Sequence, residues 1–144
     1  MSSIPNTLKV FENAITENDA NYLITLFENS DNYVMDQGRL ILSNPVTDEV
    51  KNIIKKCYNT VFDYHINKGN IGPEKPHVAD FIIIKSTTGD ECKPHTDFTE
   101  EYGKQFLTTM IYLNDDFEGG ELYFPEISIS YKPKNIQLYL FLQI

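Results

Sequence analysis

Apolar positions recur at helical spacing in the first half of the chain and at strand spacing from about residue 78 onward. A short strand is predicted at Leu8–Phe11, followed by a helix that starts after a candidate cap at Thr16. A second helix, capped by Thr47, is predicted from one apolar stripe and should end near residues 68–69. This stripe consists of Val50, Ile53, Ile54, Cys57, Tyr58, Val61 and Phe62.

The second half of the chain shows short β-branched and aromatic runs, which are typical of strands. These runs cover residues 81–84, 106–113, 121–124, 127–131 and 137–143. Gly89-Asp90, Gly119-Gly120 and residues 133–135 supply turns between them. Helices followed by strands indicate an α+β fold with an antiparallel sheet or barrel.

Composition narrows the class of protein. The chain has 144 residues, of which 41% are hydrophobic and 12% aromatic, as expected of one folded domain. A net charge of −9 argues against a nucleic-acid partner. No apolar run is long enough for a membrane span, and no signal peptide is recognisable at the start. Two cysteines, Cys57 and Cys92, make no disulfide framework, so we expect a cytoplasmic protein.

His95 and Asp97 are the candidate metal ligands. On an extended strand, residues i and i+2 point to the same side, so both side chains can reach one ion. Imidazole with carboxylate suits Fe(II), and a set of two His and one carboxylate leaves positions open for substrate and oxygen. Taken alone, the three-residue pattern fits a surface turn with an Asx hydrogen bond at least as well.

The segments around this pair extend the pattern. An apolar strand at 83–85, a glycine turn at 89–90 and the His-x-Asp motif are followed by a strand at 108–114, a Gly-Gly-Glu turn within 116–125 and a segment at 127–141. Their order and spacing across about residues 78–141 resemble the prolyl 4-hydroxylase-like branch of the Fe(II)/2-oxoglutarate-dependent dioxygenases. Ile136 stands where glycine is usual in that family.

The resemblance implies a double-stranded β-helix (jelly-roll) core, incomplete here, with N-terminal supporting helices. One domain spanning 1–144 is expected, with mainly helical support at 1–76 and a partial jelly-roll at 77–144. The implied cofactors are Fe(II) and 2-oxoglutarate, with ascorbate as a further candidate. The implied substrate is a peptide or protein hydroxylated at a proline or similar residue, and Tyr112 and Tyr123 are the candidate cofactor contacts.

The chain also departs from the family. The third ligand, a distal His, and a later basic residue for 2-oxoglutarate normally follow the segment ending at Phe141, and this sequence contains neither. Ser86 and Leu122 stand where a Tyr and a Thr contact the cofactor. His65 is expected to pack on its helix and His77 to lie in a loop. Near the Gly-Gly-Glu turn, Asp115, Asp116 and Glu118 are more typical of a solvated turn than of a cation site.

Three interpretations of the ending follow: a truncated product or fragment, a short form completed by another chain, or a non-catalytic binding module. A cupin-like metal isomerase is a further alternative. By the resemblance, a seventh strand would lie between the His-x-Asp and Gly-Gly-Glu strands, and an eighth between the first and third. Without them we expect marginal stability and either self-association or a strand-completing partner. Side chains expected to be partly uncovered are Ile82, Ile84, Met110 and Tyr123.

Overall fold

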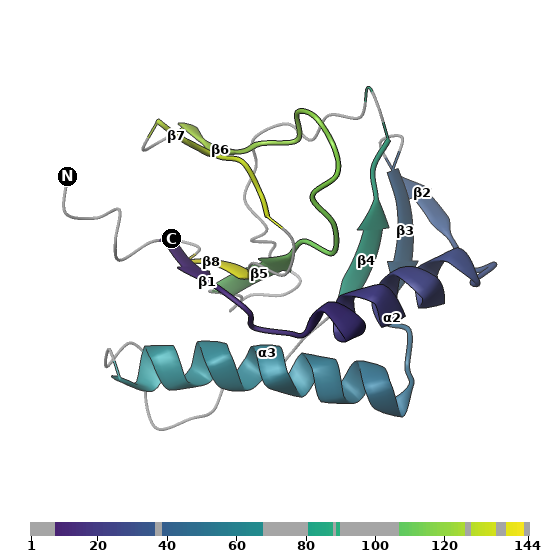
Figure 1. Ribbon diagram of the computed structural model, residues 1–144, viewed down its shortest axis with the longest axis horizontal. Helices are drawn as coiled ribbons and strands as arrows, with labels where there is room; N and C mark the ends of the chain where they lie inside the picture. Colours follow the sequence, from purple (N-terminus) through teal and green to yellow (C-terminus); the bar gives the residue numbers. More distant parts are fainter. Residues whose placement is uncertain are drawn as a thin grey trace, which may run out of the picture. The chain divides into compact units, whose positions relative to one another are not determined.

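The computed structural model describes residues 8–36, 39–67, 81–87, 89, 107–125, 128–134 and 138–142. It shows an α+β architecture with two helices and small antiparallel sheets, which confirms the predicted fold class at this level. The chain forms two compact units, drawn in Figure 1. We call residues 17–92 the helical unit, and residues 1–16 with 93–144 the strand unit.

The helical unit contains two helices and a three-stranded antiparallel sheet. In chain order its elements are α2 (Glu17–Glu28), β2 (Val34–Asp36), β3 (Arg39–Ser43), α3 (Asp48–Asn67) and β4 (Ile82–Lys85). The strand order is β2-β3-β4, with β3 in the centre (Figure 1). The sheet therefore joins a local hairpin to a strand that follows α3.

Both predicted helices are confirmed. The hydroxyl of Thr47 accepts a hydrogen bond from the Val50 backbone N–H at 3.1 Å, so Thr47 is the N-cap of α3. The first helical bond, from the Lys51 N–H to the Thr47 carbonyl, measures 3.0 Å. The helix ends at Asn67, one residue before the predicted stop.

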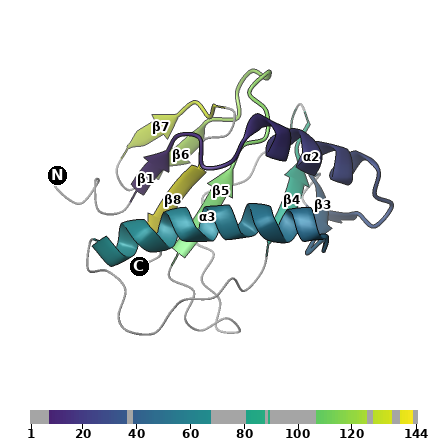
Figure 2. The same ribbon diagram turned by 60° about the horizontal axis from the view of Figure 1, so that its bottom comes forward.

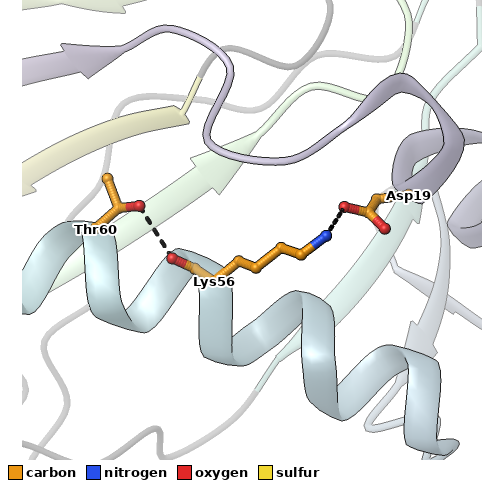
Figure 3. Close-up of polar contacts among 3 residues, drawn as sticks. All are labelled: Asp19, Lys56 and Thr60. Carbon is orange, nitrogen blue, oxygen red and sulfur yellow. Dashed lines mark hydrogen bonds and ion pairs between the residues drawn. The ribbon is translucent and has the colours of Figure 1, made fainter.

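Side chains from both helices and the sheet are buried in the helical unit. The buried apolar residues are Ala20, Phe27, Leu42, Val50, Ile53, Val61 and Ile83. Two polar contacts join α2 to α3. The hydroxyls of Tyr22 and Thr47 lie 2.8 Å apart, and Lys56 Nζ donates to Asp19 Oδ2 at 2.6 Å (Figure 3). Part of the predicted apolar stripe of α3, namely Val50, Ile53 and Val61, is buried in this core.

Sequence reasoning missed the hairpin formed by β2 and β3. The apolar run at residues 40–42 was a signal for a strand, but the alternation before it is weak. Val34 and Met35 on β2 are 61% and 70% exposed, so both successive side chains of this short edge strand face solvent. A strand without a buried face leaves little period-2 pattern to detect.

Asn44 closes the end of the β3–β4 ladder. Its backbone N–H donates to the Phe81 carbonyl at 3.0 Å, and its side-chain Oδ1 accepts from the Phe81 N–H at 3.1 Å. The residue has a positive φ of 45°, which Asn tolerates better than most residues. The predicted strand at 81–84 is confirmed as β4, one residue later than expected.

The strand unit contains no described helix. Its elements are β1 (Leu8–Phe11), β5 (Leu107–Ile111), β6 (Leu122–Phe124), β7 (Ile129–Tyr131) and β8 (Leu138–Leu142). One antiparallel sheet has the order β1-β8-β5, with β8 between its partners as Figure 2 shows. The second is the hairpin of β6 and β7. The register Leu8↔Phe141 joins opposite ends of the sequence.

Among the strands of this unit that are shorter than predicted, β5 and β7 have described residues that explain the difference. β5 ends at Ile111, so Tyr112 and Leu113 follow the strand instead of lying on it. β7 begins at Ile129 because Ser128 has a positive φ of 53° and belongs to the preceding turn. The Ser128 N–H donates to the Pro125 carbonyl at 3.2 Å, which closes that turn.

Several expectations stay predictions at this point. The observed sheets are small and antiparallel, and the jelly-roll and the single domain of 1–144 are not established by them. Of the side chains expected to be uncovered, Ile82, Ile84 and Tyr123 are 46%, 38% and 56% exposed, whereas Met110 is half-buried. Neither of the described helices has the length and apolar character needed to cross a membrane.

Candidate metal centre

The two predicted metal ligands, His95 and Asp97, lie outside the described residues, as does His77. Segments on both sides of the motif are described. Gly89 lies in a turn with a positive φ of 93°, in agreement with the predicted glycine turn, and β5 begins at Leu107. His65 lies on α3, as predicted. The metal site itself therefore stays a prediction from the sequence.

Tyr112, a candidate cofactor contact, is half-buried directly after β5. Its ring centroid lies 6.4 Å from that of Phe117, with the two rings tilted by 31°. This spacing is within the range of favourable aromatic pairs. The Tyr112 ring thus packs against a ring of the turn that follows β5.

Tyr123, the other candidate, has a different environment. It lies in the middle of β6 and is 56% exposed, whereas its neighbours Leu122 and Phe124 are half-buried. Alternate residues of a strand point to opposite faces, so Tyr123 shares the solvent-facing side of the hairpin with its partner Ser130. The two candidate cofactor contacts therefore differ in exposure, and their role at a cofactor site stays a prediction.

The turn between β5 and β6 is the most fully described part of the candidate site. Gly119 and Gly120 have positive φ values of 73° and 68°, which confirms the predicted glycine turn. Asp116 and Glu118 are exposed, and the Asn114 amide donates to Asp116 Oδ1 at 2.6 Å. Within the described ranges no group of three or more His, Cys, Asp or Glu side chains could hold a metal ion.

Lys132 contacts this turn from the end of β7. Its Nζ donates to the backbone carbonyls of Phe117 and Gly119, each at 2.8 Å, and lies 4.2 Å from the Phe117 ring centroid. Sequence reasoning did not single out Lys132. A lysine after a strand is common, and nothing in its spacing marks the turn 13 to 15 residues earlier as its partner.

The helical unit offers two further features to consider. Burial raises the pKa of the Cys57 thiol to about 11, with a smaller contribution from Asp19, so this thiol is a poor nucleophile near neutral pH.

An open hollow of about 410 Å³ lies over α3 and the start of α2. Its lining is Asp19, Glu49, Asn52, Lys55, Lys56 and Asn59. The ion pair between Lys56 and Asp19, drawn in Figure 3, is part of this lining. The lining includes neither His nor Cys.

Comparison with known proteins gives one partial similarity. The chain is 42% identical over 45 residues to a protein of Acanthamoeba polyphaga mimivirus named "Putative prolyl 4-hydroxylase". The match covers 31% of this chain, and it spans 19% of the length of that relative. No family model and no solved structure matches the chain. The similarity supports a prolyl hydroxylase-like relationship over this stretch and hints at an oxidoreductase.

Proposed function

We propose that His95 and Asp97 supply two ligands of an Fe(II) centre of the 2-oxoglutarate-dependent dioxygenase type, acting on a peptidyl proline or similar residue. The observation that carries this proposal is the 42% identity over 45 residues to the viral protein named "Putative prolyl 4-hydroxylase". The His-x-Asp motif and the segments around it, read from the sequence alone, point in the same direction.

The donor set fits the implied metal. His95 and Asp97 are separated by a single residue, so on a strand they would point to the same side. An imidazole and a carboxylate placed in this way suit Fe(II). The sequence assigns no third ligand. When bound, Fe(II) and 2-oxoglutarate would supply the oxidising chemistry, with ascorbate as a further candidate cofactor. This chain's own contribution would be to hold the metal through His95 and Asp97 and to line the cofactor site with Tyr112 and Tyr123.

The strand pairing is compatible with a partial jelly-roll core. By the resemblance, two further strands would lie against the first, third and fourth strands of the core, which correspond to β4, β5 and β6. Each of these three strands has one paired neighbour among the described strands, so each has a side on which a strand could be added. We therefore retain the jelly-roll as part of the proposal.

Metal titration tests the site. With two ligands from this chain, Mn(II) as a substitute for Fe(II) should bind weakly and exchange freely. Even loss of a second-shell partner typically costs about 10–100-fold in affinity, so His95→Ala and Asp97→Ala should each abolish measurable binding. His77→Ala and Asp116→Ala are the matched controls and should leave it unchanged. Binding that survives both ligand substitutions would contradict the assignment.

A second candidate function, strand addition at a sheet edge, is favoured by the structure of β4. Phe81 and Asn44 form a hydrogen-bonded pair, and in an antiparallel ladder such pairs alternate with non-bonded ones. Ile82 pairs with Ser43 and Ile84 pairs with Ile41, so both isoleucines stand at non-bonded positions of the β3–β4 ladder. The backbone N–H and C=O groups of Ile82 and Ile84 therefore point away from β3. These two side chains are also exposed. Among the described strands, none pairs with this edge of β4. Its backbone groups and its exposed isoleucine side chains are therefore available to a partner strand.

We propose a second copy of this chain as the partner at that edge, with Ile82 paired antiparallel to Ile84 of the copy. The net charge of −9 opposes association, so raised salt should strengthen it. Ile84→Lys should shift the chain toward monomer in sedimentation or light-scattering measurements. Val46→Lys, at a loop side chain that is 68% exposed, is the control. A chain that stays monomeric at all concentrations and salt levels would contradict this candidate function.

A further inference from the structure

The Lys132 side chain joins two parts of the strand unit that are separate in sequence. It follows β7, and its ammonium group donates to the carbonyls of Phe117 and Gly119 at 2.8 Å each. The same nitrogen lies 4.2 Å from the centroid of the Phe117 ring. One cation thus contacts the peptide backbone and the aromatic side chain of the turn that precedes β6.

The backbone conformation of this turn leaves carbonyl groups available as hydrogen-bond acceptors. Residues 117–121 lie between β5 and β6, outside both ladders. Consecutive positive φ values at Gly119 and Gly120 reverse the chain there. Hydrogen bonds from a charged donor are stronger than those between neutral groups, so the ammonium is an effective partner for these carbonyls.

The position of Lys132 is itself constrained by its neighbours. Pro133 is fully buried, and a residue before proline is restricted to extended conformations. On the other side, Tyr131 pairs with Leu122 in the β6–β7 hairpin. The backbone of Lys132 is therefore fixed by the preceding strand and the following buried proline, while its ammonium group contacts the turn.

The Phe117 ring contacts further residues of the strand unit beyond Lys132. A Cβ atom at Gly120 would lie 3.1 Å from Phe117 Cε2, so the ring packs directly over the glycine. The Phe117 ring also lies next to the Tyr112 ring, at 6.4 Å between centroids. Lys132, Phe117 and Tyr112 thus form a continuous series of contacts from β7 to the end of β5.

We propose that Lys132 is a positioning residue that sets the place of the Tyr112 ring through Phe117 and the glycine turn. This inference rests on the proposed function in one respect: Tyr112 is the candidate contact of 2-oxoglutarate. Lys132 does not touch the cofactor in this scheme. Loss of its charge would release the two carbonyls and the Phe117 ring, and Tyr112 would lose its support.

Nuclear magnetic resonance of the 144-residue chain tests the structural part without any cofactor. Because Nζ lies over the Phe117 ring, the Lys132 ε-methylene protons should be shifted upfield, and Phe117→Leu should abolish that shift. Lys132→Met should move the ring signals of Tyr112 and the amide signals of Gly119 and Gly120. Lys132→Arg, which keeps the charge, should largely restore them. Lys134→Met, two residues away, is the matched control and should leave the Tyr112 signals in place.

Binding of 2-oxoglutarate in the presence of Mn(II) tests the functional part. Loss of an outer partner that orients a group in a metal site typically costs about 10–100-fold in affinity, so Lys132→Met should weaken 2-oxoglutarate binding by about tenfold through displacement of the Tyr112 ring. In a Tyr112→Phe background the same change should have little further effect. If the wild-type chain binds no 2-oxoglutarate, the proposed function fails, while the Tyr112 signals still decide whether Lys132 positions that ring. Tyr112 signals that Lys132→Met leaves in place, or undiminished cofactor binding by that variant, would overturn the inference.

Discussion

In the helical unit, most of the described core residues lie on the apolar faces of α2 and α3, with Leu42 and Ile83 added from the sheet, and the start of α3 is capped by a threonine three positions before Val50. In the strand unit, the defining contacts join distant positions: Leu8 pairs with Phe141, and Lys132 reaches the turn at 117–119. Both Thr47 and Lys132 satisfy backbone groups that have no ladder partner. The contact of Thr47 is local in sequence, whereas that of Lys132 reaches a turn more than ten residues away. A local contact can be predicted from the sequence, and a distant one cannot.

The largest expected effect concerns the core of the helical unit. Phe27 is 4% exposed, and its ring centroid lies 4.8 Å from that of Tyr33. Phe27→Ala should reduce the free energy of unfolding by about 3–5 kcal/mol, as measured by denaturant titration. The matched change Val34→Ala, at an exposed side chain, should stay within about 0.5 kcal/mol. Equal effects of the two changes would mean that the helical unit lacks a packed core.

The glycine turn of the strand unit offers the next comparison. Gly119→Ala and Gly120→Ala should each cost about 1–2 kcal/mol, since both positions require a left-handed backbone. Gly120→Ala should cost more, because its Cβ would meet the Phe117 ring at 3.1 Å whereas Gly119 has open space. Denaturant titration of both variants measures the difference. A larger loss for Gly119→Ala would contradict the packing of Phe117 over Gly120.

The smallest expected effect is at the start of α3. Thr47→Ala removes the acceptor for the Val50 N–H and the partner of the Tyr22 hydroxyl. Loss of an N-cap costs about 0.5–2 kcal/mol of stability. Thr60→Ala is the control, because the Thr60 hydroxyl donates to the Lys56 carbonyl within the same helix (Figure 3). Helix content and unfolding free energy, measured by circular dichroism, should fall only in the first variant.

The local features of the fold could be predicted from the sequence. Thr47, the stripe of α3 and the glycines at 119–120 each act on residues within a few positions, and each was found where expected. The β2–β3 hairpin was missed because Val34 and Met35 both face solvent. The pairing of β1 with β8 could not be predicted, since neither strand carries a mark of its partner.

The candidate site was predictable to a different extent. The His95 and Asp97 motif can be recognised from residue types and spacing alone, and it stays a prediction because it lies outside the described residues. The prediction that Tyr112 lies on a strand was wrong, since β5 ends one residue earlier. Lys132 had no detectable signal, because its role depends on a turn brought to it by the hairpin.

Asn44 has a consequence for how this sequence can vary. Glycine would accept its positive φ but would leave the Phe81 N–H without the Oδ1 acceptor at 3.1 Å. Serine would offer an oxygen on a shorter side chain and tolerates this backbone conformation less well. Aspartate alone combines the same reach with the same tolerance of a left-handed backbone. Among natural variants of this chain that keep the β3–β4 ladder, position 44 should therefore alternate between two residue types that a single base change in the codon interconverts.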